Sequence, residues 1–410
     1  IILEPAKKNT APAILSSALI KEIPENQPLI FLTSDHLIEK TSMFNRSIKQ
    51  HQKYLTDKNI FIFGIKPSNP SSEFGYFLSK RMSNKYKVTE FVETEDVVEI
   101  TLNPDEKFQK ITGFGGSFTE STAYLLNQLS DENRTKILEA YFGESGARYS
   151  LTRTHMNSSD FSLSNYSYAP IPGDVTLENF SIEEDMDDII PTIKDAMTIS
   201  KDGFKIISSP WTAPIWMKDN KAWKGGKLLP EYYDTWALFF SKYLDAYAEQ
   251  GIDIWGITVE NEPLGNGENW ESMHYTPEEM NEFVVKHLGP QLEKTHPDVV
   301  LLGYDQNRDH LEEWVDVMYG DEEAAKYFDG TAIHWYASTY DVFEEALQYA
   351  HNAAPDKYLI QSEATADADV PRWQDDDWYW ANNWCLAPVI VDPEADEVYF
   401  TPLYYTMAHF

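Results

Sequence analysis

The stretch Ile254–Pro263, with the sequence IWGITVENEP, is an apolar run that ends in polar residues and a proline. Near-continuous apolar runs are typical of parallel strands buried on both faces, and Pro263 prevents a helix from continuing through the segment. The stretch therefore predicts a buried strand that delivers Glu262 at its C-terminal end. Because a carboxylate is costly to bury unless it is paired or hydrogen-bonded, Glu260 and Glu262 are either solvated loop residues or parts of a site.

The composition indicates a large globular protein with a neutral or weakly charged ligand. The 410 residues are 42% hydrophobic and 14% aromatic, which is enough for a sizeable packed core. The net charge of −34 argues against nucleic acid and anionic membrane surfaces as partners, because both would be repelled. Cys385 is the only cysteine, so it forms neither an intramolecular disulfide nor a cysteine-based zinc site. We find no apolar run of membrane-spanning length and no signal-peptide pattern, and the start of the chain is typical of a fragment boundary.

Charge is distributed unevenly along the chain. Residues 1–93 hold 13 Lys+Arg and 9 Asp+Glu, which leaves 20 Lys+Arg and 58 Asp+Glu in residues 94–410. All 12 tryptophans also lie beyond residue 210. This shift predicts two segments of different origin that meet near Glu93–Asp96, one of residues 1–93 and one of residues 97–410.

The first segment alternates strand and helix patterns, with strands predicted at Pro28–Ser34 and Ile60–Ile65. Four stretches, EPAKKNTAPAI, FLTSDHLIE, FGIKPSNPSSEFGY and KYKVTEFVE, resemble the middle of a mannose-1-phosphate guanylyltransferase. The resemblance implies a partial Rossmann-like α/β segment in which Asp35 would help to hold a divalent metal at the sugar nucleotide. The family's glycine-rich phosphate-binding signature would precede Ile1, and without it nothing orients a triphosphate for transfer. We therefore expect residues 1–93 to be a truncated, inactive remnant.

From Ile111 onward, predicted strands alternate with predicted helices, and each strand is followed by polar or aromatic residues. Seven strands are expected: Ile111–Gly116, Tyr149–Met156, Phe204–Ser209, the opening stretch, Val299–Tyr304, Gly330–Tyr336 and Lys357–Ala364. Helices are expected from the Ser130 cap through Tyr141 and at Ser181–Lys201, Pro230–Gln250, Pro277–Lys294, Asp309–Gly320 and Asp341–Ala353. This alternation predicts a (β/α)8 TIM-type barrel, in which sites lie at the C-terminal ends of the strands. Glycines 113, 115 and 116 indicate a close backbone approach rather than a phosphate loop.

The eighth strand of this barrel is missing from the sequence pattern. Glu363 is followed by a Trp- and Asp-rich stretch at 371–384, a short apolar run at Ala387–Val391, and Tyr399–Phe410, which could form a strand or a helix. We therefore expect an incomplete barrel. An unclosed barrel exposes two strand edges, which costs stability.

Glu262 and Glu363 are expected at the ends of two separate barrel strands, with aromatic residues and few cations nearby. Such a pair suits glycoside hydrolysis, in which one carboxylic acid protonates the leaving oxygen and a second carboxylate attacks the anomeric carbon. Aromatic faces stack on sugar rings, and polar side chains bond to their hydroxyls. Histidines with helical metal-ligand spacing are absent from the sequence, so neither a catalytic metal nor a cofactor is indicated.

The second segment resembles glycoside hydrolase family 30, the glucosylceramidase-type β-glycosidases. The stretches that carry the resemblance are ITGFGGSFTEST, RTHMNSSDFS, SSPWTAPIWMK, GITVENEP, HWY and IQSEA, in family order. The resemblance implies that Glu262 is the acid/base, that Glu363 is the nucleophile, and that Asn261 contacts the 2-hydroxyl of the sugar. It also implies a retaining mechanism, in which the two carboxyl groups lie about 5 Å apart and their pKa values are pushed in opposite directions.

The resemblance implies roles for further residues around the two glutamates. Asp160 and Trp211 would hold the non-reducing sugar, and His334 and Tyr336 would line the cleft. Arg153 would keep the nucleophile ionised. Each of these residues also has a plain structural interpretation, as a core aromatic, an ion-pair partner or a loop cap.

The chain departs from the family pattern in two places. The family's eighth strand and its tryptophan-rich WVDWN-type stretch should lie between Trp380 and Asn382, and the β-sandwich is represented only by Val97–Leu102. The leading hypothesis is a retaining β-glycosidase that acts on β-glucosides or β-glycans. An inactive carbohydrate-binding remnant and a sugar-nucleotide guanylyltransferase remain alternatives. Family members are often secreted or lysosomal, and the sequence alone leaves the compartment and the oligomeric state open.

Overall fold

The computed structural model describes residues 106–265, 269–338, 340–367 and 385–408, together with Arg46, residues 48–49 and two strands near the N-terminus. The chain divides into two compact units, residues 1–110 and 111–410. In the first unit, β1 (Tyr76–Met82) pairs antiparallel with β2 (Lys85–Val92). The predicted strands at 28–34, 60–65 and 97–102 lie outside the described residues, as does Asp35.

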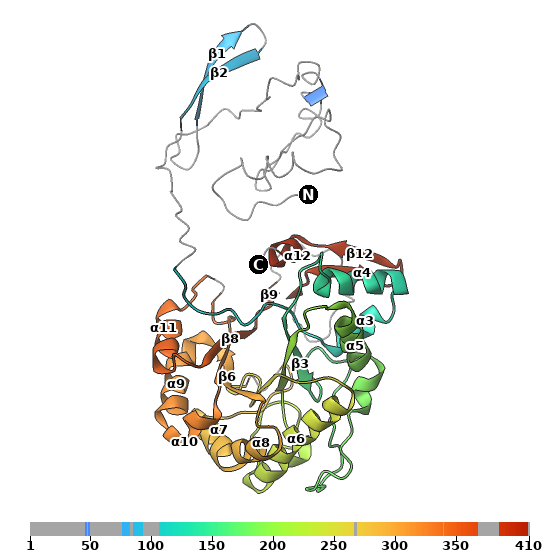
Figure 1. Cartoon of the computed structure of the whole chain (residues 1–410), viewed down its shortest axis with the longest axis vertical. Coiled ribbons are helices and arrows are strands. Elements are labelled where there is room, and N and C mark those ends of the chain that lie inside the picture. Colours follow the sequence, from blue (N-terminus) through green and yellow to red (C-terminus); the bar gives the residue numbers. More distant parts are fainter. Residues whose placement is uncertain are drawn as a thin grey trace. The chain divides into compact units, whose positions relative to one another are not determined.

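Six parallel strands form the centre of the second unit (Figure 1). They pair in the order in which they occur in the chain, from β3 to β8. The strands are β3 (Leu151–Met156), β4 (Lys205–Pro210), β5 (Gly256–Thr258), β6 (Val300–Asn307), β7 (Gly330–His334) and β8 (Tyr358–Glu363). Sequential parallel order with intervening helices confirms the predicted incomplete TIM-type fold. All six strands therefore direct their C-terminal ends to one rim.

Helices connect these strands and pack around the outside of the sheet (Figure 1). Between β3 and β7 they are η2 (Glu183–Asp187), α5 (Ile189–Ile199), η3 (Ile215–Met217), η4 (Pro230–Tyr232), α6 (Tyr233–Glu249), α7 (Pro277–Phe283), η5 (Val284–Leu288), α8 (Gly289–Thr295), η6 (Arg308–His310), α9 (Leu311–Gly320) and α10 (Glu322–Tyr327). Helix α11 (Glu344–Ala353) connects β7 to β8. Helix α6 buries Trp236, Phe239 and Phe240 completely, which anchors it to the sheet.

The expected strand at Ile111–Gly116 is not part of the sheet, so six strands replace the predicted seven. The segment still runs beside β3, because Phe118 donates to the Arg153 carbonyl at 2.7 Å and Arg153 donates to the Gly116 carbonyl at 3.1 Å. A Cβ added to Gly115 would lie 1.8 Å from the Leu151 carbonyl oxygen. The glycines therefore permit the close backbone approach that was predicted.

The helix predicted over Ser181–Lys201 is divided into η2 and α5, and the break falls at Asp188, whose φ is −143°. The cause of this break lies in contacts with other segments of the chain. The side chain of Asp185 in η2 is completely buried and accepts hydrogen bonds from the hydroxyls of Tyr166, Tyr168 and Tyr247. These contacts draw η2 inward and prevent one continuous helix.

The helix predicted over Pro277–Lys294 is also interrupted, by the π-helical turn η5. Pro290 has no backbone N–H and cannot continue an α-helical hydrogen-bond ladder, which is consistent with a local change of pitch. The start of α7 has a complete capping box between Thr276 and Glu279. Ser130 caps α4 (Asp131–Phe142) as predicted, because its side chain accepts from the Asn133 backbone N–H.

Beyond β8, no described residue joins the parallel sheet. The remaining elements are the short pair β9 (Ala366–Asp367) and β10 (Cys385–Leu386), the antiparallel hairpin of β11 (Val389–Asp392) and β12 (Glu397–Phe400), and α12 (Pro402–Met407). The hairpin lies against α4 and not at the barrel. There, Asp396 accepts from the Ser130 backbone N–H at 2.9 Å, and the Tyr404 hydroxyl donates to the Ala140 carbonyl at 2.9 Å. Helix α3 (Glu120–Leu126) precedes α4.

Candidate active site

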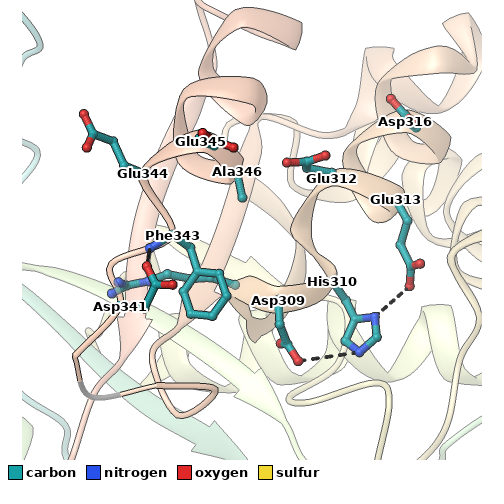
Figure 2. A pocket seen from close by; sticks show the side chains of 11 residues that line it. Asp309, His310, Glu312, Glu313, Asp316, Asp341, Phe343, Glu344, Glu345 and Ala346 are labelled. Atoms are coloured by element: carbon teal, nitrogen blue, oxygen red, sulfur yellow. Dashed lines mark hydrogen bonds and ion pairs between the residues drawn. The ribbon is translucent and has the colours of Figure 1, made fainter.

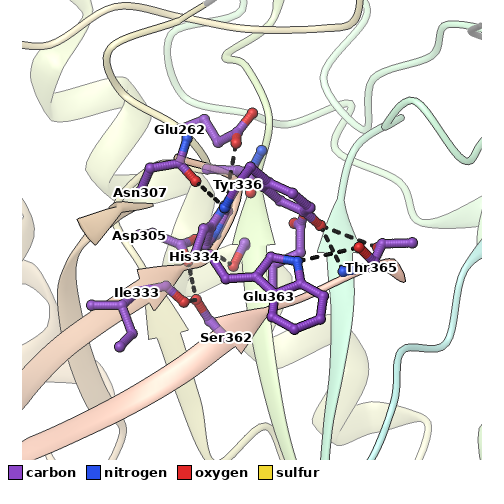
Figure 3. A network of polar contacts seen from close by, with 12 residues as sticks. Glu262, Asp305, Asn307, Ile333, His334, Tyr336, Ser362, Glu363 and Thr365 are labelled. Carbon is purple, nitrogen blue, oxygen red and sulfur yellow. Dashed lines mark hydrogen bonds and ion pairs between the residues drawn. The ribbon is translucent and has the colours of Figure 1, made fainter. Parts of the chain in front are cut away.

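The C-terminal ends of the strands bring Glu262 and Glu363 to one region (Figure 3). Glu363 is the last residue of β8 and pairs in register with His334 of β7. Glu262 follows β5, which ends at Thr258 and is shorter than the strand predicted from the sequence. The backbone of Glu262 adopts a φ of +50°, and its N–H donates to the Asp305 carbonyl at 3.0 Å. A left-handed conformation at a non-glycine residue costs free energy, and tertiary contacts of this kind hold it in place.

The carboxyl group of Glu262 has two donors. The indole N–H of Trp270 lies 3.1 Å from Oε2, and Nδ1 of His334 lies 3.3 Å from Oε1. The side chain is 12% exposed, so one edge of the carboxyl group reaches solvent.

The carboxyl group of Glu363 has a different pair of neighbours. The Arg153 guanidinium forms an ion pair with Oε2, and the Tyr336 hydroxyl donates to Oε1 at 3.0 Å. The side chain is 25% exposed, twice the value for Glu262. A guanidinium and a phenol, both donating, are partners suited to an ionised carboxylate.

A third carboxylate, that of Asp305 in β6, was missed by the sequence analysis. It is completely buried and accepts a hydrogen bond from each of the five other strands of the sheet. The donors to Oδ2 are Arg153 at 2.8 Å, Ser209 at 3.1 Å and Thr258 at 2.7 Å, and the donors to Oδ1 are His334 at 3.0 Å and Ser362 at 2.5 Å. Burial alone would raise the pKa of Asp305, but the Arg153 charge and the bonds from His334 and Ser362 hold it well below its usual range.

His334 joins Asp305 to Glu262 and is itself completely buried. Its Nε2 lies 3.0 Å from Asp305 and its Nδ1 lies 3.3 Å from Glu262, so both ring nitrogens face carboxylates. Burial would lower the pKa of His334, but Glu363, Asp305 and Glu262 together raise it to about 10. The ring is therefore cationic at neutral pH and donates from both nitrogens.

Arg153, predicted as a partner of Glu363, is buried at the centre of the same network. Besides Glu363 and Asp305, it donates to Asn261 Oδ1 at 2.9 Å and to Ser209 Oγ at 3.0 Å. Burial would lower the pKa of Arg153, but the two carboxylates raise it. The guanidinium also lies 5.0 Å from the ring centroid of Trp211, a cation–π contact that joins this indole to the network.

Asp160 lies in the loop after β3, and the charges of the site affect its pKa. Burial raises the pKa of Asp160 to about 7, and the carboxylates of Glu363, Glu271 and Glu262 add to this effect.

Tyr336 is 37% exposed and borders the opening, where its backbone N–H donates to Asn307 at 2.8 Å. The eight site residues predicted in the second segment, namely Arg153, Asp160, Trp211, Asn261, Glu262, His334, Tyr336 and Glu363, are thus brought together around the C-terminal ends of the strands.

In the described part of the chain, no group of three or more His, Cys, Asp or Glu side chains is arranged to hold a metal ion. Over the same residues, no helix is both long enough and apolar enough to cross a membrane.

A separate depression of about 820 Å³ lies between α9 and the start of α11 (Figure 2). Seven of its eleven lining residues are acidic, and neither Glu262 nor Glu363 is among them. Phe343 is its one aromatic side chain. With a mostly acidic lining and a single aromatic side chain, the depression differs from the strand ends, where several aromatic and hydroxyl side chains surround the two glutamates.

The pair of carboxylates at the ends of separate strands, with aromatic and hydroxyl side chains around them on a TIM-type sheet, defines a glycoside hydrolase. The chain belongs to glycosyl hydrolase family 30, since residues 111–376 match the model of the family's TIM-barrel domain. Residues 1–102 match the nucleotidyl transferase family, in agreement with the resemblance of the N-terminal segment.

Individual relatives support this assignment. The chain is 35% identical to the lysosomal acid glucosylceramidase of Mus musculus, in a match that covers 76% of this chain and 69% of that relative. The structure is similar to that of SrfJ from Salmonella typhimurium, with a TM-score of 0.69, 30% identity, and coverage of 75% of this chain and 76% of that one. It is also similar to that of an endo-β1,6-glucanase, with a TM-score of 0.68, 28% identity, and coverage of 77% and 80%. The substrate is therefore a glycan or a glucoside.

Proposed function

We propose that this chain is a retaining β-glycosidase that hydrolyses β-glucosides by a double displacement. The observation that carries the proposal is the unlike surroundings of the two glutamates. Glu363 faces the Arg153 guanidinium, whereas Glu262 faces Trp270 and His334. A permanently charged guanidinium suits Glu363 as the nucleophile, which stays ionised, and a titratable imidazole suits Glu262 as the acid/base, which must gain and lose a proton.

In the first step, a carboxylate oxygen of Glu363 forms a bond to the anomeric carbon while the bond to the leaving oxygen breaks. Glu262 gives its proton to that oxygen, so the aglycone leaves as a neutral alcohol. His334 supports this step, since its cationic ring, with Nδ1 3.3 Å from Oε1, stabilises the carboxylate that Glu262 becomes when it gives up the proton. In the second step, Glu262 removes a proton from water, the water oxygen attacks the anomeric carbon, and Glu363 is released.

The sugar would be held by the residues around the pair. Asn261 would contact the 2-hydroxyl through its amide nitrogen, since its oxygen accepts from Arg153. Trp211 and Asp160 would bind the non-reducing sugar, and Tyr336 would line the cleft. His334, predicted to line it too, is completely buried and would act through Glu262. The relatives named glucosylceramidase and endo-β1,6-glucanase support a β-linked glucosyl unit as the shared part of the substrate.

The test uses an aryl β-glucoside and azide as an external nucleophile. Replacing Glu363 with Gly should lower kcat by at least ~10³-fold, because no covalent intermediate forms. Azide should then restore aglycone release and yield the α-glucosyl azide. Replacing Glu262 with Ala should slow turnover by about 10²–10⁴-fold, and azide should yield the β-glucosyl azide. Unchanged turnover in Glu363→Gly, or azide products of the opposite configurations, would refute the assignment.

One observation favours a second candidate, an inactive carbohydrate-binding chain, since no described residue closes the barrel after β8. Glucoside binding by calorimetry without aglycone release from the wild-type protein would support it.

For residues 1–93, we propose a separate nucleotidyltransferase-like remnant in front of a glycosidase of residues 97–410. The family match at 1–102 and the division into units at residue 110 support this organisation. Turnover of GTP with mannose-1-phosphate would show instead that the segment is active.

A further inference from the structure

Lys218 is a completely buried lysine that contacts neither of the two glutamates of the proposed mechanism. It follows η3, and its ammonium group donates to the carbonyl oxygens of Ala222 at 2.8 Å, Trp223 at 3.4 Å and Ser272 at 2.8 Å. Two of these carbonyls belong to the loop after β4 and one to the loop after β5. A buried ammonium with carbonyl partners on two loops holds the loops together, since losing it would deprive the Ala222 and Ser272 carbonyls of this donor, whereas the Trp223 carbonyl would keep the Ser272 N–H.

The same two loops are joined by backbone contacts around the ammonium group. Ser272 donates from its N–H to the Trp223 carbonyl at 3.1 Å, and His274 donates to the Gly226 carbonyl at 2.8 Å. The Gly225 N–H donates to the Ser272 hydroxyl at 2.9 Å. Lys218 therefore lies at the centre of a junction between residues 218–229 and 269–275.

This junction continues directly to the acid/base. Trp270, two residues before Ser272, donates its indole N–H to Glu262 at 3.1 Å. At the other end of the loop, the Tyr275 N–H donates to the carbonyl of Pro263, which follows Glu262 in the chain. The position of residues 269–275 thus controls both the side-chain donor and the backbone neighbour of Glu262.

Glu260 is a buried carboxyl group close enough to this cation for each to affect the pKa of the other. It is completely buried two residues before Glu262. Burial raises the pKa of Glu260 well above its usual value, and Lys218 acts in the opposite direction. Conversely, burial lowers the pKa of Lys218 to about 8, and Glu260 opposes that change. The ammonium form therefore persists through neutral pH.

We propose that Lys218 is a positioning residue, whose ammonium group fixes the 269–275 loop and so holds Trp270 against the carboxyl group of Glu262. This inference rests on the proposed role of Glu262 as the acid/base. Lys218 acts on proton donation, and not on the nucleophile, because its contacts lead to Glu262 and none leads to Glu363. A misplaced acid slows the departure of poor leaving groups and has little effect on leaving groups that need no protonation.

The experiment compares three variants with the wild-type protein on two substrates. Lys218→Met keeps the length of the side chain and removes its charge. Trp270→Phe keeps an aromatic ring and removes the N–H. The control is Lys221→Met, which alters an exposed lysine in the same loop. The substrates are a dinitrophenyl β-glucoside, with a good leaving group, and phenyl β-glucoside, with a poor one.

Lys218→Met and Trp270→Phe should each lower kcat/KM for the phenyl substrate about tenfold more than for the dinitrophenyl substrate. This factor is smaller than the full effect of general-acid catalysis, because Glu262 itself is still present. Lys221→Met should leave both rates unchanged. Equal losses on both substrates in folded Lys218→Met, or no leaving-group bias in Trp270→Phe, would overturn the proposal. Trp270→Phe keeps the test valid if Lys218→Met fails to fold.

A second measurement separates this inference from the proposed function. Amide hydrogen exchange of residues 269–275 reports loop positioning whether or not the protein turns over a glucoside. The exchange should be faster in Lys218→Met and unchanged in Lys221→Met. Faster exchange in a chain that hydrolyses no β-glucoside would uphold the loop contact and refute the proposed function, and unchanged exchange in Lys218→Met would refute the positioning role.

Discussion

Two regions of this molecule each bury an aspartate completely, and they shift its pKa in opposite directions. Asp305 lies at the site and accepts from five strands, and two of its donors, Arg153 and His334, are cations. Asp185 lies against α6 and accepts only from the neutral hydroxyls of three tyrosines. The pKa of Asp305 falls well below its usual range, whereas burial raises that of Asp185 to about 7 despite its hydrogen bonds.

The difference shows that hydrogen bonds alone do not keep a buried carboxylate ionised in this fold. Both aspartates have several well-placed donors, but only Asp305 has opposite charges beside it. The site can therefore keep a fixed negative charge at its centre, which in turn keeps His334 protonated next to Glu262. The outer region contains a carboxyl group that titrates near neutral pH. Three predictions test this contrast.

The largest effect is expected from Asp305→Asn. The change leaves Arg153 and His334 buried beside a neutral amide, and breaking a buried charge pair in this way costs about 3–5 kcal/mol. Urea unfolding at pH 6 should show this loss, together with a large fall in turnover of an aryl β-glucoside. Asp309→Asn, an exposed neighbour, should be neutral. A stability loss below about 1 kcal/mol would show that Asp305 is not the counter-charge of these cations.

Asp185→Asn should change the pH dependence of stability more than stability itself. Because the folded pKa of Asp185 is about 7 and its ordinary value is 3.8, the folded chain keeps a proton that the unfolded chain releases. The resulting stability is complete below pH 3.8 and is lost as the pH rises through 7, by up to about 1.4 kcal/mol per pH unit. Urea midpoints between pH 4.5 and 6.5 should therefore fall with rising pH in the wild-type protein and fall less in Asp185→Asn.

The control for this experiment is Asp187→Asn, an exposed aspartate two residues away. It should keep the wild-type slope. If Asp185→Asn kept it as well, the titrating group would lie elsewhere, for example at Asp160 or Asp188, whose pKa values burial raises to about 7 and about 6.

Much of the fold follows from local patterns. The sequence patterns predicted strands that the structure places within a few residues at β3, β4, β6, β7 and β8. The errors have tertiary causes. One helix was predicted over Ser181–Lys201, and it breaks because three tyrosines from other segments bind Asp185. The opening stretch was predicted as one long strand, but β5 ends at Thr258, before the left-handed turn at Glu262.

The site was predictable to the extent that barrel topology collects strand ends. Glu262 and Glu363 come together because parallel strands share one C-terminal rim. Asp305 was missed although it directly follows the predicted strand Val299–Tyr304, since a single acid at a strand end resembles any solvated loop residue. Its importance depends on donors from five other strands, which no local pattern contains. Lys218 was missed for a related reason. Its partners are backbone carbonyls on two loops, and no sequence pattern marks them.

The smallest effect, and the finest test of the contrast, is expected from Tyr166→Phe. Tyr166 donates to Oδ1 of Asp185 at 3.1 Å, while the other two tyrosines bond to Oδ2. Losing this bond should cost about 1 kcal/mol when Asp185 is ionised and less when it is protonated, so the loss should grow as the pH rises through 7. The counterpart is Thr258→Val, which removes one neutral donor from Asp305. Its cost should stay constant as the pH rises through 7, because Arg153 and His334 still hold the charge of Asp305. Urea midpoints measured across pH for both variants test this difference. An equal pH dependence in the two would mean that neutral donors, and not cations, set the charge state of both aspartates.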